Sequence, residues 1–119
     1  MAGYRTVRIA EDIKREIASI VRELKDPRVA GKLLTVIKVE VSQDASFAKV
    51  FVSSLQGIDD AKEAVKGLVA AKGFIRREVG KRLHLRMTPE MSFVADDSVE
   101  HGMNIARILN DLKEEEHGN

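Results

Sequence analysis

The chain has 119 residues, of which 44% are hydrophobic and 33% charged, and it contains no cysteine. This composition is typical of one globular domain, and it excludes a disulfide scaffold and any site built on thiolates. No apolar run approaches the ~20 residues of a membrane-spanning helix, and the N-terminus lacks a signal-peptide pattern. One Tyr, four Phe and no Trp argue against base stacking on an aromatic platform as the obvious contact to nucleic acid.

The net charge of +1 hides a strong asymmetry along the chain. Residues 1–87 carry 18 Lys or Arg and 11 Asp or Glu, whereas residues 88–119 carry 2 and 8. A basic body of this size favours binding to phosphate backbones, because such binding releases counterions. Solvated helix faces explain the same charges equally well, so the charge alone does not decide between the two interpretations.

The first predicted element is a helix over residues 5–25. Its apolar residues recur at three- and four-residue steps, and Asp26-Pro27 ends the pattern. Two strands follow at 33–42 and 47–55. Because only the polar turn 43–46 joins them, we expect an antiparallel hairpin.

Alternation within these strands predicts which side chains share a face. In the second strand Ala48, Val50 and Val52 form one face. In the first strand one face is expected to be apolar along its whole length: Leu33, Thr35, Ile37, Val39 and Val41. We expect helices to cover one face of this hairpin.

Two helical patterns then meet at Ala71-Lys72-Gly73, which we call the elbow. Apolar residues at helical spacing occupy 58–68 before the elbow and 75–85 after it. Gly73 is the predicted bend, because glycine tolerates backbone angles that Ala and Lys resist. Two further glycines are expected to permit close helix packing: Gly67 and Gly80.

A third short strand is predicted at 90–95, with Met91 and Phe93 directed inward. Asp96-Asp97-Ser98 can cap a last helix, whose acidic end reads as a frayed tail. The prediction is therefore an α+β domain over residues 1–97, with a three-stranded sheet covered by helices. Residues 98–119 are expected to form a helical, acidic and mobile extension.

Catalytic and metal-binding constellations are difficult to assemble from this sequence. The three histidines, His84, His101 and His117, have no metal-ligand spacing with one another. Asp96, Asp97 and Glu100 could hold a hard cation, but capping and solvation explain them at least as well. We therefore predict no enzyme activity, no cofactor and no metal.

The order of elements resembles a type II KH domain. In this RNA-binding fold, a loop between two helices clamps the nucleic-acid backbone. In place of the usual Gly-x-x-Gly loop, this chain has Ala71-Lys72-Gly73, which resembles the ribosome-binding factor A family. Other segments support the same resemblance: Arg8-Ile9-Ala10, Asp26-Pro27-Arg28, Ala48-Lys49-Val50-Phe51-Val52, Gly73-Phe74-Ile75-Arg76, Leu85-Arg86, Pro89-Glu90-Met91-Ser92-Phe93 and Asp96-Asp97-Ser98. Together they span roughly residues 4–112.

The resemblance implies a cytoplasmic bacterial protein that binds the immature small (30S) ribosomal subunit. It implies a role in late maturation and 5′-end processing of the small-subunit RNA, greatest in the cold, without catalysis. Release with the help of an assembly GTPase and a monomeric state are further expectations. The predicted RNA-binding residues lie at the elbow, along the helix after it and on the first helix: Ala71, Lys72, Gly73, Arg76, Arg77, Lys81, Arg82, Arg86, Arg5, Arg8 and Arg15.

Because Ala71 carries a methyl group, we do not expect the elbow to clamp a single strand as Gly-x-x-Gly loops do. The basic helix faces are expected to follow folded RNA, with the elbow setting their angle. Three other functions stay open on the sequence: a helix-turn-helix DNA binder, a metal-dependent nuclease using Asp96, Asp97 and Glu100, and a protein-interaction module with a basic face.

Overall fold

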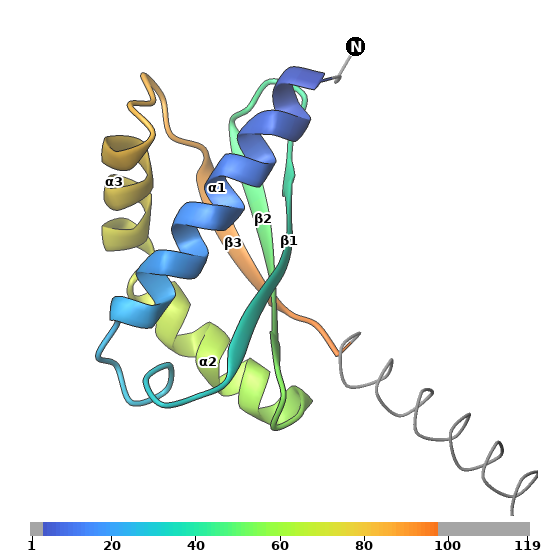
Figure 1. The fold of residues 1–119 in the computed structure, drawn as a ribbon, viewed down its shortest axis with the longest axis vertical. Helices are drawn as coiled ribbons and strands as arrows, with labels where there is room; N and C mark the ends of the chain where they lie inside the picture. Colours follow the sequence, from blue (N-terminus) through green and yellow to red (C-terminus); the bar gives the residue numbers. More distant parts are fainter. Residues whose placement is uncertain (1–3, 98–119) are drawn as a thin grey trace, which may run out of the picture.

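The computed structural model describes residues 4–97 and contains three helices and three strands in this part of the chain (Figure 1). Their bounds are α1 Tyr4–Glu23, β1 Leu34–Val41, β2 Phe47–Ser54, α2 Ile58–Ala70, α3 Lys72–Arg82 and β3 Glu90–Ala95. This order confirms the predicted α+β arrangement. The predicted extension over 98–119 lies outside the described residues.

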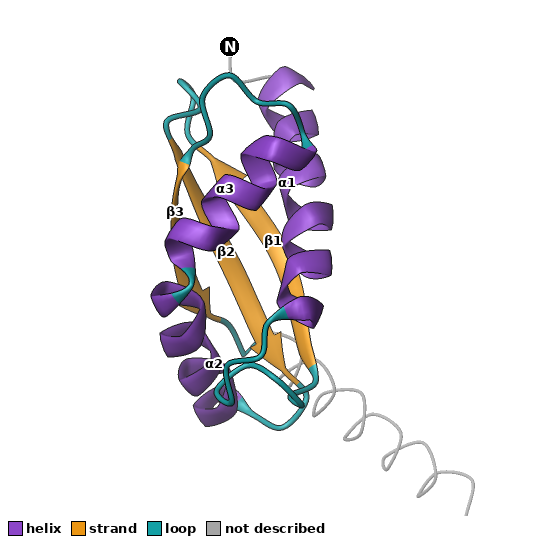
Figure 2. Ribbon diagram, turned by 90° about the vertical axis from the view of Figure 1, so that its left-hand side faces the viewer, coloured by secondary structure: helices purple, strands orange, loops and turns teal. Residues whose placement is uncertain are grey.

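The sheet has the order β1-β2-β3, with β1 and β2 antiparallel and β2 and β3 parallel. Parallel neighbours require a long crossover connection, which α2 and α3 provide. The three helices lie on one side of the sheet, as Figure 2 shows. No helix within residues 4–97 is long and apolar enough to cross a membrane.

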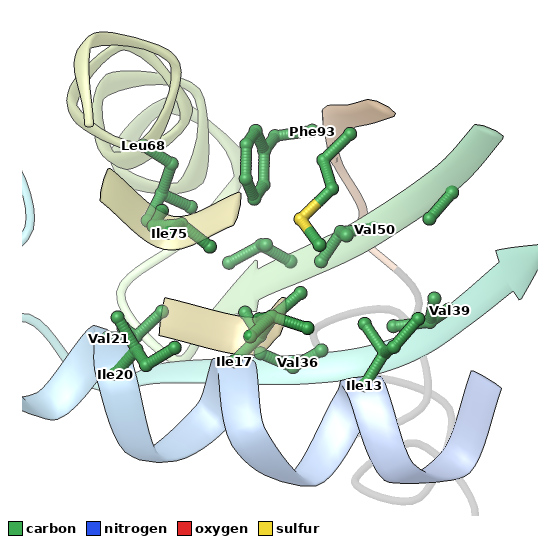
Figure 3. Packing of buried hydrophobic residues seen from close by; sticks show 14 of the residues in the cluster. Ile13, Ile17, Ile20, Val21, Val36, Val39, Val50, Leu68, Ile75 and Phe93 are labelled. Carbon is green, nitrogen blue, oxygen red and sulfur yellow. The ribbon is translucent and has the colours of Figure 1, made fainter. Parts of the chain in front are cut away.

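The core lies between the helices and the sheet (Figure 3). Isoleucines at 13, 17 and 20 bury one face of α1, as the helical spacing predicts. Ala48, Val50 and Val52 of β2 are buried, and so are Met91 and Phe93 of β3, which confirms the alternation predicted for both strands. Leu68, Ile75 and Val79 complete this core from α2 and α3.

The predicted apolar face of β1 is wrong. Val36 and Val39 are the buried positions, three residues apart, whereas Leu33 is 58% exposed and Thr35 is exposed. The pairing of β1 with β2 shifts between Val36 and Lys38, so Ile37 has no partner in the register. An extra residue of this kind reverses the alternation of side chains on its two sides.

The predicted bend at Gly73 is also wrong. Ala71 separates the two helices, with φ −94° and ψ 8°. Its N–H donates to the carbonyls of Gly67 and Leu68, and its own carbonyl accepts from Ile75 N at 2.9 Å. Gly73 lies inside α3, where a Cβ atom would meet nothing within 4 Å. The helices therefore bend without a left-handed glycine.

The close packing predicted at Gly67 and Gly80 is present, but loops make the contact instead of helices. A Cβ atom on Gly67 would lie 2.7 Å from Val29 Cγ2, in the turn that follows α1. A Cβ atom on Gly80 would overlap the hydroxyl of Thr88, in the loop before β3. Each glycine thus lets a connecting segment lie directly against a helix.

Two turns are held by carboxylates whose hydrogen bonds favour the ionised form. Asp26 accepts from Arg28 N, Nε and Nη2 at 2.8, 3.0 and 2.8 Å, and these bonds, the side-chain ones foremost, lower its pKa to about 2. Hydrogen bonds from Ser46, first through its hydroxyl and then its backbone N–H, lower the pKa of Asp44 to about 2.

These carboxylates predict that stability falls in acid. A depressed pKa contributes stability that is fully present above the unfolded value of 3.8 and is lost as the pH falls towards about 2. The urea midpoint should therefore decline between about pH 4 and pH 2. Asp26→Asn should flatten this decline. A variant whose urea midpoint declines as steeply as that of the unaltered chain would contradict this role of Asp26.

Candidate nucleic-acid interface

Cationic side chains gather around α3 and the loop that leads from it to β3. Arg76, Arg77, Arg86, Met87 and Thr88 line a groove of about 400 Å³, which we call the arginine groove. Arg76 and Arg77 are adjacent in α3, and Arg86 reaches the same groove because the loop turns back beside the helix. Guanidinium groups suit phosphate oxygens, since they donate in a planar fork.

Arg76 fixes the geometry of the arginine groove. Its Nε and Nη2 atoms donate to the carbonyl of Thr88 at 3.2 and 2.9 Å, so α3 holds the loop directly. Gly80 leaves room for the Thr88 side chain on the same helix. This attachment brings Arg86 and Met87 to the mouth of the groove.

The other cations of this surface are available to a ligand. Lys72, Arg77, Lys81 and Arg86 are exposed, and none of them forms an ion pair within residues 4–97. Their charges are therefore not neutralised by a described carboxylate. A polyanion can pair with them without breaking contacts that hold the fold.

Arg82 is a predicted RNA-binding residue, but its side chain is largely covered and paired with carboxylates. Its side chain is 25% exposed, and its Nη2 atom lies 3.0 Å from Glu23 and 3.3 Å from Glu78. Its Nη1 atom lies 3.9 Å from Glu16. The hydrogen bond to Glu23 is the largest cause that raises the pKa of Arg82. Arg82 thus joins α3 to α1, and a contact with RNA would compete with three carboxylates.

The candidates on α1 lie outside the arginine groove. Arg15 is exposed and pairs with Asp12 at 3.2 Å, whereas Arg8 is exposed without an ion pair in the described part of the chain. Arg5 lies in the first turn of α1, and its side chain is outside the described residues. The structure therefore brings Arg76, Arg77 and Arg86 together and leaves the α1 cations apart from them.

The elbow offers a second place for an anion. No side chain caps the N-terminus of α3, which begins at Lys72, and Gly73 leaves its surface bare. Backbone N–H groups at a helix N-terminus attract negative charge. The first turn of α3 therefore lies on the same helix as Arg76 and Arg77 of the arginine groove, and both places favour an anion.

Sequence reasoning missed Met87 and Thr88. Met87 is 82% exposed at the edge of the arginine groove. No spacing rule signals such a residue, because its exposure depends on how the loop is tied to α3. No group of three His, Asp or Glu side chains able to hold a metal occurs within residues 4–97. Glu100, of the candidate carboxylate cluster, lies outside the described residues.

The sheet topology, the paired helices and the elbow define a class of protein, the type II KH-like α+β domain. Residues 5–109 match the profile of the ribosome-binding factor A family. Ribosome-binding factor A from Clostridium tetani is 49% identical over 121 aligned positions, which cover 100% of this chain and 99% of the relative. The chain therefore belongs to the ribosome-binding factor A family, as the sequence resemblance predicted.

Solved structures agree with this assignment. The crystal structure of ribosome-binding factor A from Thermus thermophilus gives a TM-score of 0.65 at 26% identity, over 76% of this chain and 93% of that one. A homology model of the Thermus thermophilus factor, fitted into a cryo-EM map of its 30S complex, gives a TM-score of 0.64 at 25% identity. That match covers 77% of this chain and 96% of that one.

Proposed function

We propose that this chain binds the immature small ribosomal subunit through the arginine groove and the elbow. Binding there promotes late maturation and 5′-end processing of the small-subunit RNA, and the chain catalyses no step itself. The observation that carries the proposal is the arginine groove, with Arg77 and Arg86 free of described ion pairs, in a family one of whose members was fitted into a 30S complex.

The physical basis is binding of phosphate by positioned cations. Arg77, Lys81 and Arg86 supply charges without described carboxylate partners, and Arg76 holds the loop that carries Arg86. Each phosphate that is neutralised releases condensed counterions, which favours binding independently of sequence. Specificity for one RNA fold then follows from the fixed angle between α2 and α3 at Ala71. The proposal also includes a cytoplasmic location, a greater need in the cold and release assisted by a GTPase.

Binding at two salt concentrations tests the proposal. The chain should bind small subunits that carry unprocessed 5′ ends more tightly than mature subunits. Its affinity should fall about 10-fold or more between 50 and 200 mM salt, because several phosphate contacts are made. A duplex DNA with as many base pairs as the subunit RNA has nucleotides, measured at the same salt, should bind the chain much more weakly. Co-sedimentation with labelled chain provides the measurement.

Equal affinity for the duplex and the subunit would contradict the proposal and favour the DNA-binding alternative. Tight binding that does not change with salt would instead favour a protein-interaction module, since phosphate contacts are necessarily screened. The same RNA incubated with the purified chain and magnesium should stay intact, and its cleavage would favour the nuclease alternative.

A further inference from the structure

The face of the sheet that the helices leave uncovered carries an exposed aromatic ring. Ala48, Val50 and Val52 point into the core, so the alternate residues Phe47, Lys49 and Phe51 point away from the helices. Phe47 is 59% exposed. Figure 2 shows the helices on the other side of the strands.

Strand pairing gathers polar groups around Phe47. In the parallel register Phe47 lies beside Glu90 and Lys49 beside Ser92, and neighbours in a register share a face. Lys49 also pairs with Glu40 of β1 in the antiparallel register. One end of the uncovered face therefore presents a ring, an ammonium group, a hydroxyl and two carboxylates.

These residues line a groove of about 550 Å³, which we call the sheet groove. Lys72 is the one residue from a described helix among those that line it. Since Lys72 is also the first residue of α3, the sheet groove is continuous with the elbow. A ligand at the elbow can reach the uncovered face of the sheet without leaving the surface.

The chemistry of the sheet groove differs from that of the arginine groove. Glu90 has no ion pair within residues 4–97, and a free carboxylate repels phosphate. Carboxylates do accept hydrogen bonds from the amino groups of nucleobases. Glu40 is paired with Lys38 at 3.1 Å, so its charge is already balanced. The volume lies within the ~300–1,000 Å³ typical of small-ligand sites.

Phe47 is better placed to stack on a base than Phe51. The ammonium groups of Lys38 and Lys49 lie 4.6 and 5.6 Å from the centroid of the Phe51 ring, so that ring already has cationic partners. Phe47 has no such partner within the described residues and stands at the groove. Unpaired bases in RNA stack on exposed rings of this kind.

We propose that the sheet groove binds one unpaired nucleobase of the RNA that contacts the elbow. The base stacks on Phe47, its amino group donates to Glu90, and a neighbouring phosphate lies at Lys72. This inference rests on the proposed function and adds a site of single-strand recognition to it. Bases with an exocyclic amino group, which are adenine, cytosine and guanine, are preferred to uracil.

Single-stranded hexanucleotides A6, C6, G6 and U6 test the inference, with backbone amide shifts and fluorescence anisotropy as readouts. The amides of Phe47, Lys49 and Ser92 should shift on titration. Phe47→Leu should weaken binding of the preferred hexanucleotide about 5- to 100-fold, since stacking on one ring contributes that much. Phe51→Leu, the same change on the same face, should alter it less than about twofold. Glu90→Gln should reduce the preference over U6.

Several outcomes would overturn the inference. Equal losses for Phe47→Leu and Phe51→Leu would do so, as would amide shifts that bypass the sheet groove. A Phe47→Leu variant that weakens subunit binding but binds every hexanucleotide normally would assign the groove to a ribosomal protein. If Phe47→Leu lowered the melting temperature, the Glu90→Gln variant would test the inference instead, and an unchanged preference over U6 would overturn it. Should the unaltered chain bind small subunits while no hexanucleotide enters the groove, only this inference fails; without subunit binding, the proposed function fails too.

Discussion

Reversing the charges of Arg77 and Lys81 together is expected to weaken binding to immature small subunits by on the order of 100-fold. Both side chains are exposed on α3 and have no ion pair in the described part of the chain. Hydrogen bonds to charged groups contribute about 1.5–3 kcal/mol each, so two lost phosphate contacts account for about two factors of ten. Glutamates in their place would also repel the RNA.

Stability should change little in this double variant. Exposed substitutions alter the free energy of unfolding by about 0.5 kcal/mol, and the loss of a cation in the last turn of α3 adds about as much. Thermal melting and co-sedimentation on the same preparation separate the two effects. A large fall in melting temperature would show that Arg77 or Lys81 supports the fold.

A matched control is Lys25→Glu with Lys62→Glu. Both lysines are exposed, neither has an ion pair in the described residues, and neither lines the arginine groove. This pair changes the net charge by the same amount as the first. If both double variants lost affinity equally, net charge would explain binding, and the arginine groove would not be the interface.

Arg77 and Arg82 show why the binding surface could be predicted only in part. Both are arginines of one helix, and the sequence treats them alike. Glu16 and Glu23 distinguish them, because these carboxylates reach Arg82 from α1, more than 50 residues earlier in the chain. Only the packing of α1 against α3 reveals that contact. The arginine groove likewise depends on Thr88, whose carbonyl meets Arg76.

The fold was more predictable where local rules act alone. Alternation placed β2 and β3 correctly, since both strands keep a regular register with each other. The predicted apolar face of β1 is wrong because the register of this strand shifts between Val36 and Lys38. The apolar pattern of residues 33–42 does not indicate an extra residue. At the elbow, the conformational freedom of glycine predicts a bend at Gly73, whereas Ala71 accommodates the bend with a negative φ.

Gly67→Ala is expected to destabilise the chain by about 1–2 kcal/mol. Its new methyl group would lie 2.7 Å from Val29 Cγ2 and 3.3 Å from Arg28 Cβ. Val29 is buried and β-branched, so it cannot rotate away cheaply. Overpacking of this kind costs about 1–3 kcal/mol, of which the better helix propensity of alanine offsets up to about 1 kcal/mol. Urea unfolding would measure the difference.

Gly73→Ala is the matched control, because it makes the same change in a helix where nothing lies within 4 Å. It should raise the stability by up to about 1 kcal/mol. A Gly67→Ala variant as stable as Gly73→Ala would mean that the turn after α1 does not rest on α2.

The two glycine variants should also differ in their binding to the small subunit. If RNA approaches the bare surface of α3 at the elbow, Gly73→Ala should weaken subunit binding although it stabilises the fold, whereas Gly67→Ala should lower stability without removing an interface residue.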